Sequence, residues 1–200
     1  MKPIIQKFYS SDKSVASTVR TIVLFGRNVS TYKFALASTL LNLKPKNFIT
    51  YEDLRDEFLK SLLSHYQKNP YQFQAGKNSL TKAFDQYKID GNWNDLLKIA
   101  EKNIYNNVFD AFHNVGGSSI KKEHILFEHL PKEKKLVLTD NINAILEQHN
   151  LLEILKNENE SRWMIEFFFH TSRAVVSIVK RKLILPQTRK MQIFQMLITL

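Results

Sequence analysis

Apolar residues recur at helical spacing through most of the chain. The first amphipathic stripe has four members at i, i+4, i+7 and i+8: Val15, Val19, Ile22 and Val23. Ser14 is a candidate cap for this helix, and Gly26 is expected to end it by adopting a left-handed conformation. A second helix is predicted to begin after a cap at Ser30 or Thr31 and to end before Pro45. Its predicted inner face consists of Tyr32, Ala35, Leu36, Thr39 and Leu40.

The middle of the chain continues this helical pattern. Thr50 and Asp53 have the spacing of a capping box, with Asp in place of the usual Glu. The helix that follows is predicted to bury Leu54, Phe58, Leu62, His65 and Tyr66. After a flexible loop at residues 74–78, a short helix is expected over residues 80–88, and a longer one over residues 94–113.

Beyond residue 117 the apolar residues no longer follow the helical spacing. Residues 125–127 and 135–138 look like two short strands joined by a charged turn. Thr139 and Asp140 are expected to cap the next helix, and a last helix is predicted over residues 151–179. The predicted fold is mainly α, a multi-helix domain with a small β-hairpin. A winged-helix-like element and a hairpin that only stabilises the helices fit the pattern equally well.

Composition supports a folded and mainly helical protein. The 200 residues include 44% hydrophobic and 12% aromatic residues, more than disordered chains carry, and only 5 Gly and 5 Pro. Cysteine is absent, which excludes disulfides, thiolate zinc sites and a cysteine nucleophile. A chain without cysteine suits a reducing compartment, so we predict a cytoplasmic location.

The net charge of +10 invites a nucleic-acid partner, but its distribution is uneven. Six of the 29 basic residues lie in residues 167–200, which contain no acidic residue, so residues 1–166 carry a net charge of only +4. The start of the chain has no apolar core long enough for a signal peptide. The best candidate for a membrane span, residues 163–179, is interrupted by Glu166, His170 and Arg173. We therefore predict no membrane partner.

The turn between the first two predicted helices carries the candidate binding chemistry. Arg27 and Asn28 precede a helix amino terminus, where free amide groups and partial positive charge suit a phosphate. Lys33 would add charge, and Arg20 flanks the turn, so these four residues are the candidate DNA contacts. Two helices around such a turn overlap in pattern with helix-turn-helix proteins. The competing interpretation, which we favour, is that Gly26 and Asn28 supply turn geometry and that Arg27 pairs with a carboxylate.

Catalytic and metal-binding patterns are missing from the sequence. The six histidines show no metal-ligand spacing, so we predict no metal site and no cofactor in this chain. No nucleotide-binding glycine motif and no nucleophile elbow occurs either. Asp53, Asp56 and Glu57 cluster on one helical turn, and a hydrolase that uses them would require the three carboxylates to converge in a cleft. Acidic residues at a helix amino terminus are more simply explained by the helix dipole, so we expect no catalytic residue.

Four segments resemble, in order, the region that precedes the nuclease module of predicted bacterial HNH endonucleases. They are Leu24–Leu36 (LFGRNVSTYKFAL), Phe109–His113 (FDAFH), Leu138–Asp140 (LTD) and Glu160–Trp163 (ESRW). The resemblance implies a DNA-associated protein of restriction or defence type whose amino-terminal part positions or recognises the substrate. The catalytic and metal-binding residues of that family have no counterpart here. The resemblance therefore places a divalent metal only in the missing HNH module.

The resemblance covers residues 15–163 and divides the chain in two. Residues 1–163 are predicted to form a helical substrate-recognition-like domain, and residues 164–200 a basic and apolar tail. We hypothesise that the reading frame is shifted and truncated relative to an intact nuclease gene. The rival hypothesis is that the tail is a genuine partner-binding helix, for example in an oligomer, whose state the sequence leaves open. The alternative function is a helical protein-interaction or regulatory module, antitoxin-like or immunity-like, with no role on nucleic acid.

Overall fold

The fold is mainly helical with a small antiparallel sheet. The structure is a computed structural model that describes residues 3–12, 14–26, 32–68, 70, 73, 79–103 and 105–182, and only the backbone of residues 10, 102, 103, 105–107 and 167–182. The helices are α1 (Pro3–Ser11), α2 (Val15–Phe25), α3 (Tyr32–Leu41), α4 (Tyr51–Lys68), α5 (Ser79–Asp90), α6 (Trp93–Asn103), α7 (Tyr105–Ala111), α8 (Asp140–Leu146) and α9 (His149–Lys182). The strands are β1 (Phe48–Thr50), β2 (Asn114–Val115), β3 (Ser118–Ser119), β4 (Phe127–Leu130) and β5 (Lys135–Leu138).

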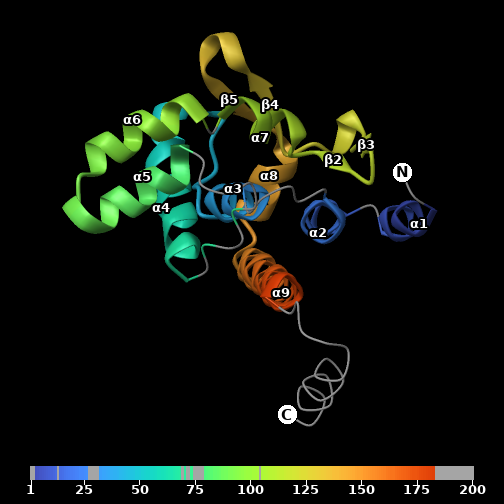
Figure 1. Cartoon of the computed structure of the whole chain (residues 1–200). Coiled ribbons are helices and arrows are strands. Elements are labelled where there is room, and N and C mark those ends of the chain that lie inside the picture. The colour runs from blue at the N-terminus through green and yellow to red at the C-terminus, as the bar shows by residue number, and fades with distance from the viewer. Residues whose placement is uncertain are drawn as a thin grey trace, which may run out of the picture.

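Helix α3 lies at the centre of the molecule (Figure 1). It contacts α4 on one side and α9 on another, while α2 and α7 approach it as well. Its buried residues therefore surround the helix: Lys33, Phe34, Ala35, Leu36, Ala37, Thr39, Leu40 and Leu41. Ala35, Leu36, Thr39 and Leu40 of the predicted inner face are buried and Tyr32 is half-buried, and packing on several sides buries the other faces of α3 as well. A helix that is apolar all round is the one that other helices enclose.

The predicted amino-terminal caps of α2 and α4 are confirmed. The backbone N–H of Ser17 donates to Ser14 Oγ at 3.1 Å, and that of Asp53 donates to Thr50 Oγ1 at 3.1 Å. Each cap satisfies an amide group that the first helical turn leaves without a partner. The five residues predicted to form the inner face of α4 are all buried.

Gly26 ends α2 as predicted, but not in the predicted conformation. Its φ is −57° and its ψ is 140°, which is extended backbone and not the left-handed region. Glycine is required here by space, since a Cβ would collide with the carbonyl oxygen of Ile22 and lie 3.1 Å from Lys33 Nζ. The extended exit also lets Gly26 form a β-bridge with Val115. The proposed caps at Ser30 and Thr31 lie outside the described residues.

The loop predicted at residues 74–78 lies outside the described residues. The helix predicted over residues 94–113 is helical in α6 and α7 up to Ala111; residue 104 between them lies outside the described residues, so the continuity of this helix stays a prediction. One prediction about a cap needs correction. Thr139 precedes α8 but forms no side-chain cap, because its hydroxyl donates to carbonyl groups near the start of β4.

The sheet has the strand order β1-β5-β4, and all its pairs are antiparallel. The hairpin of β4 and β5 matches the predicted one, although β4 begins at Phe127 and not at Ile125. Strand β1 was not predicted; it pairs Phe48 with Val137 and Thr50 with Lys135. The short β2–β3 hairpin was not predicted either. A winged-helix arrangement remains one of the two alternatives for the larger hairpin.

Helix α9 is the longest element in the described part of the chain. Its 34 residues span about 51 Å at 1.5 Å per residue. The predicted helix over residues 151–179 is confirmed and slightly extended at both ends. The helix continues without a break through residues 163 and 164, so the predicted domain boundary lies inside α9. The division of the chain into two parts stays a prediction. In the described residues, no helix is both long enough and apolar enough to cross a bilayer.

Candidate functional site

Two of the four candidate DNA-contact residues, Arg20 and Lys33, lie in the described part of the chain. Arg27 and Asn28 lie outside the described residues. Arg20 on α2 forms an ion pair with Glu158 on α9, with 2.8 Å between Nε and Oε2, and both side chains are partly exposed. This pair fixes α2 against α9, and it already neutralises the guanidinium that was expected to flank a phosphate.

Lys33 is buried, with 7% of its surface exposed. Its Nζ donates to the carbonyl oxygen of Asn114 at 2.7 Å, and burial lowers the pKa of its ammonium group to about 8. Lys33 and the Gly26–Val115 bridge together tie the carboxyl end of α2 and the start of α3 to the β2–β3 hairpin. Because its ammonium group is held inside the protein, the position of Lys33 does not support direct contact with a phosphate. The DNA contact of Lys33 stays a prediction.

Two residues of the middle family-like segments also act inside the protein. His113 Nε2 accepts from the backbone N–H of Leu126 at 3.0 Å. Burial, with a smaller effect from Lys33, lowers the pKa of this imidazole to about 4, so the ring is neutral and keeps its acceptor at neutral pH. Thr139 Oγ1 lies 2.7 Å from the carbonyl oxygen of Ile125 and 3.0 Å from that of Leu126. These contacts hold the chain entering β4 against the end of α7 and the start of α8.

Trp163, from the last family-like segment, is fully buried. Its ring stacks on His65 of α4, with centroids 3.2 Å apart, and on Phe34 of α3, with centroids 5.8 Å apart. His65 Nε2 lies 3.3 Å from Glu160 Oε2, and this contact is the main cause of a lowered pKa of the Glu160 carboxyl. The inner face of α9 is thus fixed to the two central helices by an aromatic stack with a polar edge.

The carboxylates at the start of α4 do not form a shared site in the contacts that the structure describes. Asp56 pairs with Arg55 at 3.1 Å, and Glu57 pairs with Lys60 at 2.8 Å. Within the described ranges, no group of three or more His, Asp or Glu side chains is arranged to hold a metal ion. That a divalent metal belongs only to the missing HNH module stays a prediction.

A chain of three polar side chains supports the β4–β5 hairpin close to its turn. Tyr51 at the start of α4 hydrogen-bonds to His129 Nε2, and His129 Nδ1 lies 2.6 Å from Asp110 Oδ1 on α7. Burial and the Asp110 charge raise the pKa of Tyr51, so its hydroxyl keeps its proton and acts as a donor. With the Tyr51 hydroxyl donating to Nε2 of His129, the other ring nitrogen, Nδ1, is the one that donates to Asp110. The arrangement clamps α4, α7 and β4 together, and a phenol that keeps its proton is a poor nucleophile.

An exposed basic turn lies at the end of the β4–β5 hairpin, and we call residues 131–135 the basic turn. It contains Lys132, Lys134 and Lys135 with one acid, Glu133, which pairs with Lys135. Lys132 and Lys134 are exposed, and their ammonium groups form no ion pair with the described residues. Sequence analysis found a charged turn here without assigning it a function; the available signal was three lysines within four residues.

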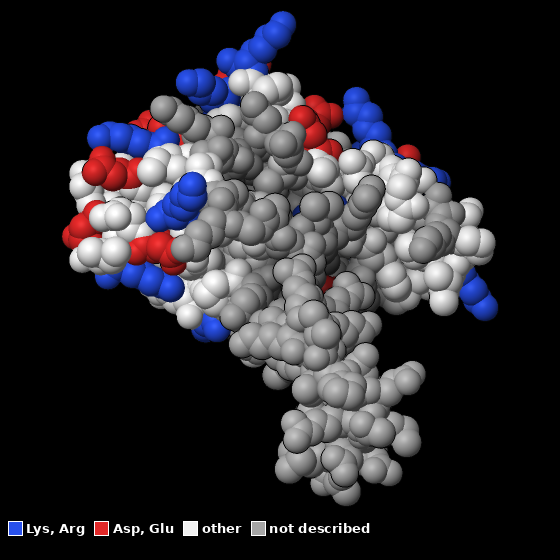
Figure 2. Space-filling view, in the orientation of Figure 1, with Lys and Arg blue, Asp and Glu red and all other residues white. Residues whose placement is uncertain are grey.

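Charges elsewhere on the visible face are mixed. Over α4, α5 and α6, Lys and Arg side chains alternate with Asp and Glu, whereas Lys or Arg side chains project over the β4–β5 hairpin (Figure 2). The hairpin end therefore differs from the helical face beside it, which shows no concentration of one sign of charge.

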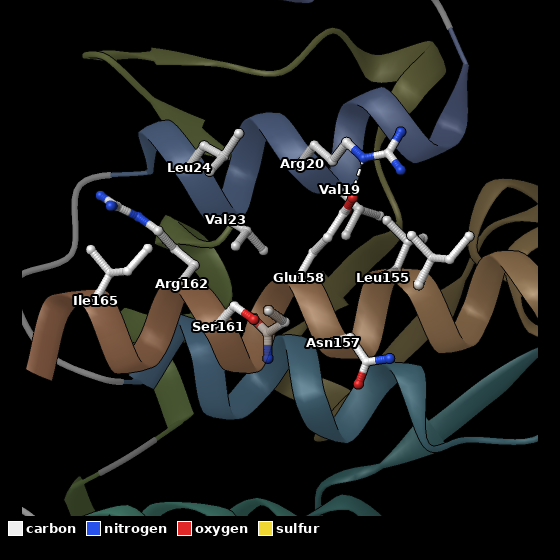
Figure 3. A pocket seen from close by; sticks show the side chains of 12 residues that line it. Val19, Arg20, Val23, Leu24, Leu155, Asn157, Glu158, Ser161, Arg162 and Ile165 are labelled. Carbon is white, nitrogen blue, oxygen red and sulfur yellow. Dashed lines mark hydrogen bonds and ion pairs between the residues drawn. The ribbon is translucent and has the colours of Figure 1, made fainter.

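The second surface feature is a groove between α2 and α9, which we call the α2–α9 groove. It encloses about 480 Å³. Its lining comes from both helices: Val19, Arg20, Val23, Leu24, Ile154, Leu155, Asn157, Glu158, Asn159, Ser161, Arg162 and Ile165. Three large apolar side chains in it are unusually exposed: Leu24 at 38%, Ile154 at 49% and Ile165 at 45%. Leu24 and Ile165 lie at the same end of the groove (Figure 3), whereas Ile154 lies eleven residues from Ile165 along α9.

Polar groups border this groove at both ends. Leu24 and Ile165 lie at one end, near Arg162, and the Arg20–Glu158 pair lies toward the other (Figure 3). Arg162 pairs with Glu166 at 2.6 Å. Within the described part of the chain, two buried atoms of groove residues, Asn159 Oδ1 and Arg162 Nε, have no hydrogen-bond partner. Sequence analysis missed this surface, because its two walls are separated by more than 100 residues.

Comparison with known proteins identifies no similar protein. No protein-family model, no curated protein and no solved structure matches the chain. Function must therefore be argued from the surfaces described above and from the resemblance of the four segments.

Proposed function

We propose that the chain is the DNA-associated amino-terminal region of an HNH endonuclease-like protein of restriction or defence type, without nuclease activity of its own. The order of the four family-like segments supports the family. The observation that carries DNA association is the basic turn, where two exposed lysines have no ion-pair partner among the described residues. Arg27 and Asn28 remain candidate contacts in the loop before α3.

The basic turn is well placed to contact a phosphate backbone. A lysine that is not already paired releases a counterion from DNA without first losing a carboxylate partner. The turn is held by β5 and by the clamp of Tyr51, His129 and Asp110, so its lysines are presented from an ordered support. Contacts of this kind position a protein on DNA and carry no base sequence by themselves.

A salt series on the whole chain tests this proposal. Lys132→Gln combined with Lys134→Gln should weaken binding of a fluorescent DNA duplex and reduce the slope of log K against log salt by about 2, since each phosphate contact contributes about 0.9. The matched control is Lys98→Gln on α6, an exposed lysine paired with Asp95, which should leave the slope unchanged. Equal slopes for the double variant and the unsubstituted protein would reject the basic turn. Failure of the unsubstituted protein to bind DNA would reject DNA association altogether.

The second candidate function is a helical protein-interaction or regulatory module. The α2–α9 groove favours it, because three exposed apolar side chains gather there on two helices. The same salt series separates the two functions, since an interaction module of this class has no salt-dependent affinity for DNA.

A further inference from the structure

The three-stranded sheet has one buried face and one open face. Successive residues of a strand point to opposite faces, and residues paired across an antiparallel ladder share a face. The buried face carries Ile49, Phe127, Leu136 and Leu138. The open face, which we call the outer sheet face, consists of Phe48, Thr50, Glu128, Leu130, Lys135 and Val137. The β4–β5 hairpin, which supplies two of its three strands, projects from the helices (Figure 1).

Phe48 is an exposed aromatic residue on the outer sheet face. It lies on the edge strand β1, opposite Val137, and 50% of its surface is exposed. The ammonium group of Lys135 lies 5.3 Å from the centroid of its ring, a cation–π contact. Proteins that bind single-stranded nucleic acid stack bases on aromatic rings that lie within a positively charged surface. Phe48 and Lys135 together have this chemistry.

Lysines without ion-pair partners lie on both sides of Phe48. The basic turn lies on one side, because Thr50, two residues after Phe48, pairs with Lys135. On the other side, Lys44 is exposed and Lys46 is half-exposed, and neither forms an ion pair with the described residues. The chain at Lys46 is held in place by Asn143 of α8 through two hydrogen bonds, of 3.2 and 3.1 Å, to its backbone.

The acidic residues near this surface are engaged elsewhere. Glu128 pairs with Lys122, and Glu133 pairs with Lys135. Glu52 and Asp53 belong to the first turn of α4, where the helix dipole stabilises negative charge. The ammonium groups left without a carboxylate partner complement a phosphate backbone that passes over Phe48.

We propose that the outer sheet face binds single-stranded DNA, with an unpaired base stacked on Phe48 and the flanking phosphates held by the basic turn and by Lys44 and Lys46. Phosphate contacts do not distinguish single strands from duplexes by themselves, so the discrimination comes from the ring. In a duplex each base is already stacked between its neighbours, whereas an unpaired base offers its face to an aromatic side chain. The inference deepens the proposed DNA association, rests on it, and names the substrate as single-stranded.

The first test compares a labelled oligothymidine strand with a labelled duplex of the same length, and the unsubstituted protein should bind the strand more tightly. Phe48→Leu keeps an apolar side chain and removes the ring, so it should weaken binding of the strand about 5- to 100-fold and leave binding of the duplex unchanged. Phe48→Trp retains an aromatic ring and should bind the strand as the unsubstituted protein does. The matched control is Ile89→Ala on α5, which changes an 80% exposed apolar residue outside the sheet and should alter neither affinity.

The second test separates the ring from the lysines. Lys44→Gln combined with Lys46→Gln should reduce the slope of log K against log salt for the strand by about 1.4, since each phosphate contact on a single strand contributes about 0.7. Phe48→Leu removes no charge and should leave this slope unchanged. An unchanged slope in the lysine variant would overturn the path of the strand across Phe48.

The third test observes stacking directly, because a base stacked on an indole ring quenches its fluorescence. Oligothymidine should quench the emission of Phe48→Trp more than that of the unsubstituted protein, in which the emission comes from Trp93 and Trp163. Equal quenching of the two proteins would overturn the assignment of Phe48 as the stacking residue.

Failure of this inference is distinguishable from failure of the proposed function. If the unsubstituted protein binds neither form of DNA, DNA association itself is rejected. If it binds the duplex more tightly than the strand, or if Phe48→Leu weakens both forms equally or neither, only the single-strand site is overturned. Circular dichroism of each variant establishes that the fold is kept.

Discussion

Both faces of α9 carry large apolar side chains, yet they differ in what covers these side chains. The inner face carries Trp163, which is fully buried between His65 and Phe34, while the outer face carries Ile165, two residues later and 45% exposed. An ordinary surface helix is apolar on one face and polar on the other. Helix α9 thus joins its own domain through its inner face, while Ile165 on its outer face stays half exposed.

The largest effect expected from this comparison is at Trp163. Trp163→Ala should lower the free energy of unfolding by about 3–5 kcal/mol, because it removes a fully buried aromatic ring and leaves a cavity between α3, α4 and α9. Urea denaturation measures the change. A loss below about 1 kcal/mol would mean that the inner face is not the core side of the helix.

A smaller effect is expected at the polar edge of the inner face. Glu160→Gln should lower the free energy of unfolding by up to about 1 kcal/mol at pH 7, since the carboxylate is half exposed and solvent screens its attraction to His65. The pKa of Glu160 is lower in the folded protein than in the unfolded chain. Its stabilisation is therefore present above the unfolded pKa and disappears as the pH falls through the folded pKa. Urea curves of the two proteins should therefore converge only as the pH falls below the ordinary range of a carboxyl group; a constant difference would exclude ionisation as the cause.

The smallest effect on stability is expected on the outer face. Ile165→Ala should change the free energy of unfolding of the single chain by less than about 0.5 kcal/mol, as substitutions of exposed residues usually do. Urea denaturation at low protein concentration, where association is weakest, is the appropriate measurement. A loss comparable to that of Trp163→Ala would show that both faces of α9 belong to one core, and the distinction between them would fall.

Sequence analysis found the elements whose signals are local. The caps at Ser14 and Thr50 and the inner residues of α4 follow from spacing within one or two turns, and they are confirmed. Strand β1 was missed because its three residues carry no alternation of their own, and pairing with β5 places them in the sheet. For a similar reason α3 was predicted with one inner face, since only the tertiary arrangement encloses it on several sides.

The candidate site was less predictable than the fold. Arg20 was predicted to flank a phosphate-binding turn, but its ion-pair partner Glu158 lies 138 residues away in sequence, beyond the reach of any local pattern. Lys33 was read as surface charge because a lysine is seldom buried, and its contact with the Asn114 carbonyl depends on a hairpin that was not predicted. Several residues on which the proposed nuclease family rests, among them His113 and Trp163, maintain the fold.

The continuity of α9 links association to the thermal behaviour of the protein. Ile165 in the groove and Trp163 in the core belong to the same two helical turns, so the groove exists only while the core is folded. A partner that binds the folded state alone adds RT ln(1 + [L]/Kd) to the free energy of unfolding. The melting temperature then rises with the concentration of that partner. Such a chain would be most resistant to heat, and to proteases that attack unfolded protein, where its partner is most abundant.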